Sequence, residues 1–447
     1  MDDANLEREL HAVGERLWSA LPPAARNPLK AADAKAMELA AQDAELKAAL
    51  FRFVDVVPAC RSLDDLARHL TGFLGEVEAP RPPVAVAMRM GNTRAGRTAL
   101  GAAAAAGVKH MAQRFIVGES PKAALGTLRD LWKDGVASSV DLLGEATVTQ
   151  AEAQRYAERC DEALRTIAGA TAKWPDRPAL ERDSAGALPR ANLSVKVSAL
   201  TPLLRPDAPE RGKRDAADRL RGLLRRAREV GAHLHIDMES LDSRDAVLEL
   251  VLELLAEPEF REGPSAGMVL QAYLRDSPGT LDTVLDWAGG AGNGRTHPLT
   301  VRLVKGAYWD HEIVEAAQHG WTAPVFEVKA DSDRNFEELT RRMIDSGRLR
   351  VAIASHNLRS IAHAIAYNQH AGRPPEDLEL QVLRGLGDPL QHAVAAQGLR
   401  VRTYCPVGDL VAGMAYLVRR LLENTSNDSF LADQAKGVPL EELLAAP

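Results

Sequence analysis

The sequence predicts an α/β protein, a (β/α)8 TIM-like barrel that is preceded by an N-terminal helical arm and helical region. Two observations lead to this fold. Beyond about residue 135, short apolar runs of β-forming residues alternate eight times with helical segments, as in a closed parallel barrel. Nearly every run also ends in a polar or ionisable residue, and the carboxyl ends of barrel strands form the opening in which active sites are built.

The first 135 residues are predicted to be helical because Ala, Leu, Glu and Lys dominate them and apolar residues recur at helical spacing, as over 5–50. A Pro-rich break at 79–83 divides this region. We expect the alanine-rich segment 100–107 to form a helix of small residues that belongs to the core.

The second region supplies the strands and helices of the predicted barrel. The expected strands cover 138–143, 192–198, 232–238, 267–273, 299–306, 351–356, 378–383 and 400–404. The helical segments between them include 214–230, 244–256, 335–346 and 360–367, and an amphipathic helix over 409–424 completes the set. We therefore expect a helical region over 1–135, a barrel over 136–430 and a linker-like tail over 431–447.

An open, doubly wound sheet is the alternative fold for the same alternation of strands and helices. That fold normally carries a glycine-rich turn directly after its first strand. The glycine cluster at 289–294 instead precedes an expected strand, so it lacks the context of a dinucleotide-binding turn. The barrel is therefore the preferred interpretation, and 447 residues suffice for a barrel and a helical region.

Polar residues at the strand ends identify the predicted opening of the barrel. In chain order they are Glu145, Lys196, Asp237, Gln271, Lys305, His356, Gln381 and Tyr404, and Arg302 lies within the fifth strand. Burying such groups is costly unless they pair with one another or hold a ligand. Eight of them around one ring therefore indicate a binding site.

The charges at this opening favour an anionic substrate or cofactor. Lys196, Arg302, Lys305, Arg419 and Arg420 are cationic, whereas Asp237, Glu145 and Glu423 are anionic. Adjacent arginines such as Arg419 and Arg420 can grip a carboxylate through planar, bidentate hydrogen bonds. Glu423 lies on the same helix face and can hold one of them.

Composition and motifs exclude several other functions. The net charge of −7 argues against nucleic-acid binding. A secretory signal and an apolar run long enough to span a bilayer are both absent from the sequence, so we expect a cytoplasmic protein. The three cysteines lack C-x-x-C spacing and no H-E-x-x-H motif occurs, so we expect no metal site. Because no metal site is expected, we expect an organic cofactor to carry out the chemistry that side chains alone cannot perform.

At these residues the sequence resembles proline dehydrogenase, specifically the barrel domain of the bacterial bifunctional proline utilization A flavoproteins. The two most specific blocks are VRLVKGAYW at 301–309 and YLVRRLLEN at 416–424. Further matching blocks lie at 141–145, 193–199, 235–239, 269–273, 354–357 and 403–408. Arg384 and Met238 depart from the residues expected at their positions, but neither change removes a key side chain.

The resemblance implies that L-proline is oxidised to Δ1-pyrroline-5-carboxylate by hydride transfer to N5 of a bound FAD, the first step of proline catabolism to glutamate. Electrons would then pass to a membrane quinone. The residues implied around the substrate are Lys196, Arg419 and Arg420 at the carboxylate, Tyr404, Leu383 and Tyr308 around the ring, Asp237 as a support near the flavin, and Glu145 as the partner of Arg419. The residues implied around FAD are Gln271, Arg302, Val304, Lys305, Ala307, Trp309, Ser355, His356, Asn357, Glu423 and Phe430.

The resemblance also shapes what is expected of the whole protein. The phenol of Tyr404 would crowd a ring hydroxyl, so proline is favoured over hydroxyproline. No basic ribbon-helix-helix segment is found at the N-terminus, so transcriptional repression is not expected. The tail resembles the linker before an aldehyde dehydrogenase module, so the chain is either the N-terminal half of a bifunctional enzyme that also carries glutamate-semialdehyde dehydrogenase or a stand-alone relative.

Two alternative functions remain open from the sequence. One is a (β/α)8 enzyme of another chemistry, such as an isomerase with a phosphate loop at 385–387. The other is a regulatory or scaffolding domain without catalysis. Homo-oligomer formation, the identity of the quinone and peripheral association with the inner face of the membrane are not decided by the residues.

Overall fold

The computed structural model describes residues 3–22, 43–78, 82–144, 147–409, 413 and 437–447. Its centre is a closed barrel of eight parallel strands in the order β1-β10-β9-β8-β7-β6-β5-β4. The strands are β1 (Ala137–Leu142), β4 (Asn192–Lys196), β5 (His233–Asp237), β6 (Ser265–Gln271), β7 (Thr300–Val304), β8 (Arg350–Ala354), β9 (Leu378–Leu383) and β10 (Val401–Val407). The predicted barrel and all eight predicted strands are confirmed, with ends shifted by at most three residues.

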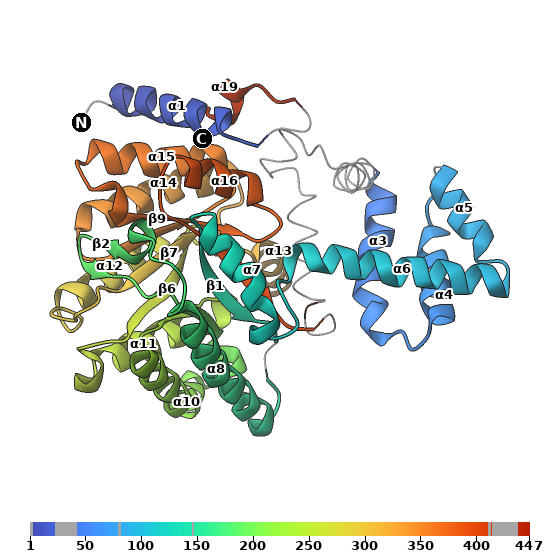
Figure 1. Ribbon diagram of the computed structural model, residues 1–447, viewed down its shortest axis with the longest axis horizontal. Coiled ribbons are helices and arrows are strands. Elements are labelled where there is room, and N and C mark those ends of the chain that lie inside the picture. The colour runs from blue at the N-terminus through green and yellow to red at the C-terminus, as the bar shows by residue number, and fades with distance from the viewer. Residues whose placement is uncertain (1–2, 23–42, 79–81, 145–146, 410–412, 414–436) are drawn as a thin grey trace.

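Helices surround the barrel and form the region before it (Figure 1). Before β1 lie α1 (Asp3–Ser19), α3 (Ala44–Val56), α4 (Leu63–Leu74), α5 (Pro82–Met90), α6 (Arg94–Phe115) and α7 (Pro121–Lys133). The barrel contains α8 (Gln150–Thr171), α9 (Pro178–Glu181), α10 (Pro209–Val230), α11 (Leu241–Ala256), α12 (Ser277–Gly289), α13 (Trp309–His319), α14 (Lys329–Ser346), α15 (Leu358–His370) and α16 (Asp388–Ala396). A short helix, α19 (Leu440–Leu443), follows near the C-terminus, whereas the helix predicted over 409–424 falls almost entirely outside the described residues.

Short elements complete the described structure. Four 3-10 turns are η1 (Val57–Ala59), η2 (Val197–Ala199), η3 (Pro258–Phe260) and η4 (Pro375–Asp377). An antiparallel hairpin of β2 (Arg182–Asp183) and β3 (Gly186–Ala187) lies between α9 and β4. Local sequence explains several helix ends: Thr149 and Glu152 form a capping box at the start of α8, and Gly231 adopts the left-handed conformation that ends α10.

Two hydrophobic cores divide the described helices. Helix α1 belongs to the barrel core and packs on α15, where Arg359 bonds both Glu7 and Glu337. Helices α3–α6 form a separate core that lies to one side of the barrel in Figure 1. The C-terminal end of α6 joins the two parts, because Arg114 donates to the carbonyl of Gly385.

The expectation that the alanine-rich segment 100–107 is core is wrong for most of its length. Leu100 and Gly101 are buried, whereas the other residues of the segment are half-buried or exposed. Helix α6 packs against α4 along one side, where the absence of a side chain at Gly101 lets the backbone of Leu63 approach closely. Ala104 and Ala105 are half-buried against the core of the helical region, whereas Ala102, Ala103 and Ala106 are exposed.

The barrel interior is polar, in contrast to the branched apolar residues that usually fill such barrels. Polar residues occupy alternate positions of several strands: Asn192, Ser194 and Lys196 on β4, His233, His235 and Asp237 on β5, Glu379 and Gln381 on β9, and Arg402 and Tyr404 on β10. Hydrogen bonds between strands that are not neighbours, such as Tyr404 to Asp237, show that these side chains face inward. The residues between them, such as Leu193, Val195 and Ile236, are fully buried and form the layer under the helices.

This crowded interior predicts an unusual sensitivity at Gly267. A Cβ atom at Gly267 would lie 2.8 Å from the carbonyl oxygen of Thr300 and against the ring of His235. We expect Gly267→Ala to lower the free energy of unfolding by about 1–3 kcal/mol. Gly222→Ala is the control, because Gly222 is exposed in α10 with open space around it, and it should raise that energy by about 0.5–1 kcal/mol. Urea unfolding measures both, and equal effects of the two changes would contradict this packing.

Candidate active site

Three strands bring Lys196, Asp237 and Tyr404 together at the carboxyl end of the barrel. Lys196 and Asp237 are the last residues of β4 and β5, and Tyr404 lies in β10. Oη of Tyr404 donates to Oδ2 of Asp237 at 2.6 Å, and Nζ of Lys196 lies 3.7 Å from the same oxygen. The carboxylate of Asp237 thus gathers an ammonium group from the neighbouring strand β4 and a phenol from the more distant strand β10.

Arg302 joins this cluster from β7. Its Nη1 donates to Oδ1 of Asp237 at 2.7 Å, and its guanidinium carbon lies 5.3 Å from the centre of the Tyr404 ring. Ser194 also donates to Oδ1 of Asp237, at 3.2 Å. Both oxygens of Asp237 are therefore engaged, and four of the predicted site residues form one connected unit that we call the Asp237 cluster: Lys196, Asp237, Arg302 and Tyr404.

Asp141 is a member of this site that the sequence interpretation did not single out. It lies in β1, is almost completely buried, and accepts a hydrogen bond of 2.6 Å from Nζ of Lys196. The signal was present in the sequence: Asp141 lies between the apolar residues Val140 and Leu142, as expected for a strand residue that faces the barrel interior.

The environment fixes the charges of this cluster. Burial alone would lower the pKa of Lys196, but the carboxylates of Asp141 and Asp237 outweigh it and raise that pKa above its ordinary value. Burial and the same two carboxylates raise the pKa of Tyr404 well above the usual range. At neutral pH, Lys196 is therefore a cation and Tyr404 is a neutral hydrogen-bond donor.

A chain of buried polar groups continues from Arg302 toward the other end of the barrel. Nε of Arg302 donates to Gln381 at 2.6 Å, and Gln381 in turn donates to Glu379 at 2.6 Å. Glu379 accepts two hydrogen bonds from Arg402, at 2.8 and 2.9 Å. Burial would raise the pKa of Glu379, but the charge of Arg402 outweighs it and lowers that pKa to about 2. Arg302 is thus held from both sides.

The helical region contributes one wall of the opening. Leu383 and Tyr404 pack against a small cluster that contains Leu143, Phe115 and Leu386. His356 fixes the end of β9 from the other side, because its Nε2 accepts a hydrogen bond of 2.9 Å from the main-chain N–H of Leu383. The predicted ring-pocket residues Tyr404 and Leu383 therefore lie side by side in a supported apolar wall.

The remaining residues predicted for the cofactor lie at the ends of β6 and β7 and on the segments that follow β7 and β8. Lys305 pairs with Asp333, Trp309 donates to the carbonyl of Phe326, and Gln271 donates to the carbonyl of Glu239. Val304 is half-buried against the barrel core, Ala307 is exposed, and Tyr308 packs beside Tyr273. Ser355 and Asn357 shape the start of α15, where Asn357 caps the helix through the N–H of Ser360.

Five residues predicted for the site cannot be placed. Glu145, Arg419, Arg420, Glu423 and Phe430 lie outside the described residues. Their roles therefore stay predictions.

The described residues fit an anionic, partly aromatic cofactor such as FAD. The start of α15 presents main-chain N–H groups, which favour phosphate. Gly306, directly after β7, has a φ of +142°, and a Cβ atom there would overlap the ring of Tyr273. Gly306 thus allows close packing against Tyr273 directly after the cations Arg302 and Lys305, whose charges favour an anionic ligand.

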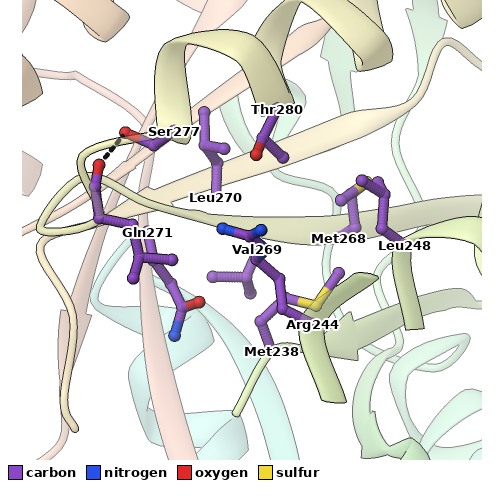
Figure 2. A pocket seen from close by; sticks show the side chains of 10 residues that line it. Met238, Arg244, Leu248, Met268, Val269, Leu270, Gln271, Ser277 and Thr280 are labelled. Atoms are coloured by element: carbon purple, nitrogen blue, oxygen red, sulfur yellow. Dashed lines mark hydrogen bonds between the residues drawn. The ribbon is translucent and has the colours of Figure 1, made fainter. Parts of the chain in front are cut away.

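A pocket beside β6 is separate from the Asp237 cluster. Figure 2 shows it between the strand and neighbouring helices, lined by Met238, Arg244, Leu248, Met268, Val269, Leu270, Gln271, Leu274, Ser277 and Thr280. Arg244 is paired with Asp245 and Asp276. The lining is mainly apolar and contains none of the charged residues of the Asp237 cluster.

The chain is similar to known proteins over most of its length. Residues 124–433 match the family model described as proline dehydrogenase, and residues 7–115 match that of the proline utilization A N-terminal domain. The bifunctional protein PutA of Klebsiella aerogenes is 33% identical over 350 residues, which are 75% of this chain and 25% of that protein. The proline dehydrogenase of Deinococcus radiodurans is 29% identical over 322 residues, which are 72% of this chain and 89% of that protein.

Solved structures agree with the curated relatives. The crystal structure of proline utilization A from Bdellovibrio bacteriovorus, inactivated by N-propargylglycine, is similar with a TM-score of 0.89 and 37% sequence identity. The similarity covers 99% of this chain and 44% of that one. The chain thus spans about a quarter of the length of the first curated relatives and less than half of this solved structure.

The pair of Glu379 and Arg402 predicts a pH-dependent stability. Glu379→Gln should lower the free energy of unfolding at neutral pH by about 3–5 kcal/mol, because it leaves a buried guanidinium uncompensated. The folded pKa of about 2 lies below the ordinary value of 4.5, so this carboxylate stabilises the fold above about pH 4.5 and loses that effect as the pH falls toward 2. The difference between wild type and variant should therefore shrink on acidification.

Urea unfolding at a series of pH values measures this difference. Glu338→Gln is the matched control, because Glu338 is exposed on α14, and it should give a small difference. A difference for Glu379→Gln that stays constant across the acidic range would contradict the assigned ion pair.

Proposed function

The chain belongs to the proline dehydrogenase family, and from this premise we propose that it oxidises L-proline to Δ1-pyrroline-5-carboxylate with a bound FAD. The Asp237 cluster is the observation that carries the proposal. It places two cations, a neutral phenol and a carboxylate whose two oxygens both accept hydrogen bonds at one end of the barrel. A carboxylate-bearing ring can be oriented there.

The proposed FAD would supply an acceptor for the hydride that leaves the substrate carbon. The residues that would hold it are Arg302, Gln271 and Lys305, with Val304, Ala307 and Trp309 between the end of β7 and the start of α13 and with Ser355, His356 and Asn357 just before α15. The helix start favours its phosphate groups, and the fixed guanidinium of Arg302 favours electron-rich atoms of the ring. Glu423 and Phe430 belong to the same proposal through the family motif.

The substrate carboxylate is proposed to bind Lys196, Arg419 and Arg420. Lys196 supports this role because the two neighbouring carboxylates keep it protonated while it is largely buried. Arg419 and Arg420 enter through the matching motif, with Glu145 as the partner of Arg419. Tyr404, Leu383 and Tyr308 would enclose the apolar ring, so that charge at one end and packing at the other fix its orientation.

Asp237 is proposed to position its neighbours rather than to accept the proton of the substrate amine. Its oxygens already receive hydrogen bonds from Arg302, Ser194 and Tyr404. Both oxygens are thus occupied by hydrogen bonds within the barrel. Its role is to hold the guanidinium and the phenol in fixed places, and the phenol in turn leaves little room for a ring hydroxyl on the substrate.

The alternative of a phosphate-binding barrel enzyme is not supported by the segment 385–387, where a phosphate loop was expected. The N–H of Gly385 donates to Asp388 at 3.0 Å and its carbonyl accepts from Arg114, so this main chain is already used for packing against α6. No observation favours the scaffolding alternative over catalysis.

Electron transfer and the context of the whole protein are further parts of the proposal. We infer a membrane quinone as acceptor from the family, with a cytoplasmic protein that meets the membrane peripherally. No helix in the described part of the chain is long and apolar enough to cross a bilayer. The match to the N-terminal domain of proline utilization A supports a bifunctional protein whose aldehyde dehydrogenase module follows residue 447.

Anaerobic bleaching tests the proposal directly. The purified protein should be yellow, and L-proline should bleach its visible absorption in the absence of oxygen, because the ring oxidation reduces the cofactor. Absorption spectra recorded before and after the addition of L-proline measure this. A protein that cannot take up FAD, or whose FAD spectrum does not respond to L-proline, would refute the proposed activity.

The carboxylate site predicts a selective defect in Arg420→Met. Loss of a charge-assisted hydrogen bond costs about 1.5–3 kcal/mol, which corresponds to an approximately ten- to hundredfold weaker affinity for L-proline. The FAD content should stay at the wild-type level. Spectral titration measures both quantities, and Arg211→Met on the exposed face of α10 is the control. An unchanged proline affinity would remove Arg420 from the proposed site.

A further inference from the structure

A second polar cavity lies at the amino ends of the barrel strands, opposite the Asp237 cluster. Its lining includes the first residues of five strands, among them His233, Thr300 and Arg350, together with Leu188 and Pro189 after the β2–β3 hairpin. The other lining residues are Asn192, His235, Ser265, Val351, Glu379, Gln381, Arg400 and Arg402. The cavity belongs neither to the proposed substrate site nor to the proposed cofactor site.

Positive charge exceeds negative charge around this cavity. Arg402 forms two hydrogen bonds with Glu379, and Arg350 forms two with Asp183, at 2.8 and 3.1 Å. Arg400 has no carboxylate of its own, because it only lies 3.4 Å from the Glu379 oxygen that Arg402 already uses. Three guanidinium groups thus face two carboxylates, and one positive charge is left over.

The two histidines of the lining do not alter this excess. Burial and the nearby arginines lower the pKa of His233 and of His235 well below the usual range, so both rings are neutral at physiological pH. His233 is also occupied, since its Nδ1 lies 2.9 Å from Oγ of Ser265 and its Nε2 lies 3.2 Å from His235.

Two nitrogen atoms of this lining are left without hydrogen bonds to any described residue. They are Nε of Arg400 and Nε2 of His235, whose residues are 3% and 1% exposed. The contact of Arg400 with Glu379 does not have hydrogen-bond geometry, and its Nη1 makes only a long bond of 3.4 Å to the carbonyl of Arg182. A buried donor left unsatisfied costs about 1–3 kcal/mol, more when it is charged, so a partner is expected.

We propose that this cavity binds a monatomic anion of the halide class, with Arg400 as its principal contact. A halide matches the surplus charge and can accept a hydrogen bond from Nε of Arg400, and the neutral His235 adds a second unsatisfied nitrogen to the same lining. The free space among these residues is about the size of a single water molecule, so a monatomic anion fits it better than a phosphate or a carboxylate. Water is the competing occupant, but it would leave the surplus charge uncompensated.

Crystals of the wild-type protein grown or soaked with bromide in place of chloride test the proposal without any variant. The anomalous signal of bromide separates it from water. A peak within hydrogen-bond distance of Nε of Arg400 is expected. Its absence, with water at that position, would overturn the proposal.

Thermal unfolding tests the same site in solution. At constant ionic strength, replacing gluconate by chloride should raise the Tm of the wild type progressively, because a ligand that binds only the folded state stabilises it by mass action. Arg400→Gln should lose this response, whereas Arg205→Gln, which changes an exposed arginine after β4, should keep it. A chloride response that survives in Arg400→Gln would contradict the assignment. Should Arg400→Gln not fold, the bromide experiment decides alone.

Discussion

The carboxylate of Asp237 is the interaction on which the architecture of the barrel opening depends. It receives hydrogen bonds from residues of β4, β7 and β10. No two of these three strands are neighbours in the barrel. Breaking a buried ion pair costs about 3–5 kcal/mol, far more than a surface pair contributes. Because Arg302 and Tyr404 share this one acceptor, neither can move without leaving a buried group unpaired, and this holds the opening in shape before any ligand binds.

The sequence predicted the barrel well because alternation of strands and helices is a local signal. The predictions from sequence were wrong where the structure depends on contacts between distant parts of the chain. The last strand was expected to end at Tyr404 but continues to Val407, because residues up to Val407 pair with β1, more than 250 positions earlier. The alanine-rich part of α6 was assigned to the core from its composition, yet only contact with α4 decides which side of a helix is covered. Both outcomes depend on tertiary contacts that no short window of sequence contains.

The sequence predicted that Lys196, Asp237 and Tyr404 lie at one end of the barrel, but it did not predict which side chains contact one another. Strand-end position identified Lys196, Asp237 and Tyr404 without any knowledge of their contacts. Asp141 was missed because it lies inside a strand, one residue before its apolar end, and the register between β1 and β4 had to be known before it could be paired with Lys196. Glu379 was missed for the same reason: its partner Arg402 stands on the next strand, and only their pairing makes a buried carboxylate tolerable.

A double-mutant cycle on Lys196 and Arg302 tests the central claim most directly. These two cations are not hydrogen-bonded to each other and are linked through Asp237. Lys196→Met and Arg302→Met are made singly and together, and the free energy of unfolding is measured for each protein. If Asp237 links them, the double variant loses more stability than the two single variants combined, by more than about 0.5 kcal/mol, because its carboxylate then keeps only neutral donors. Additive losses would contradict the shared role of Asp237.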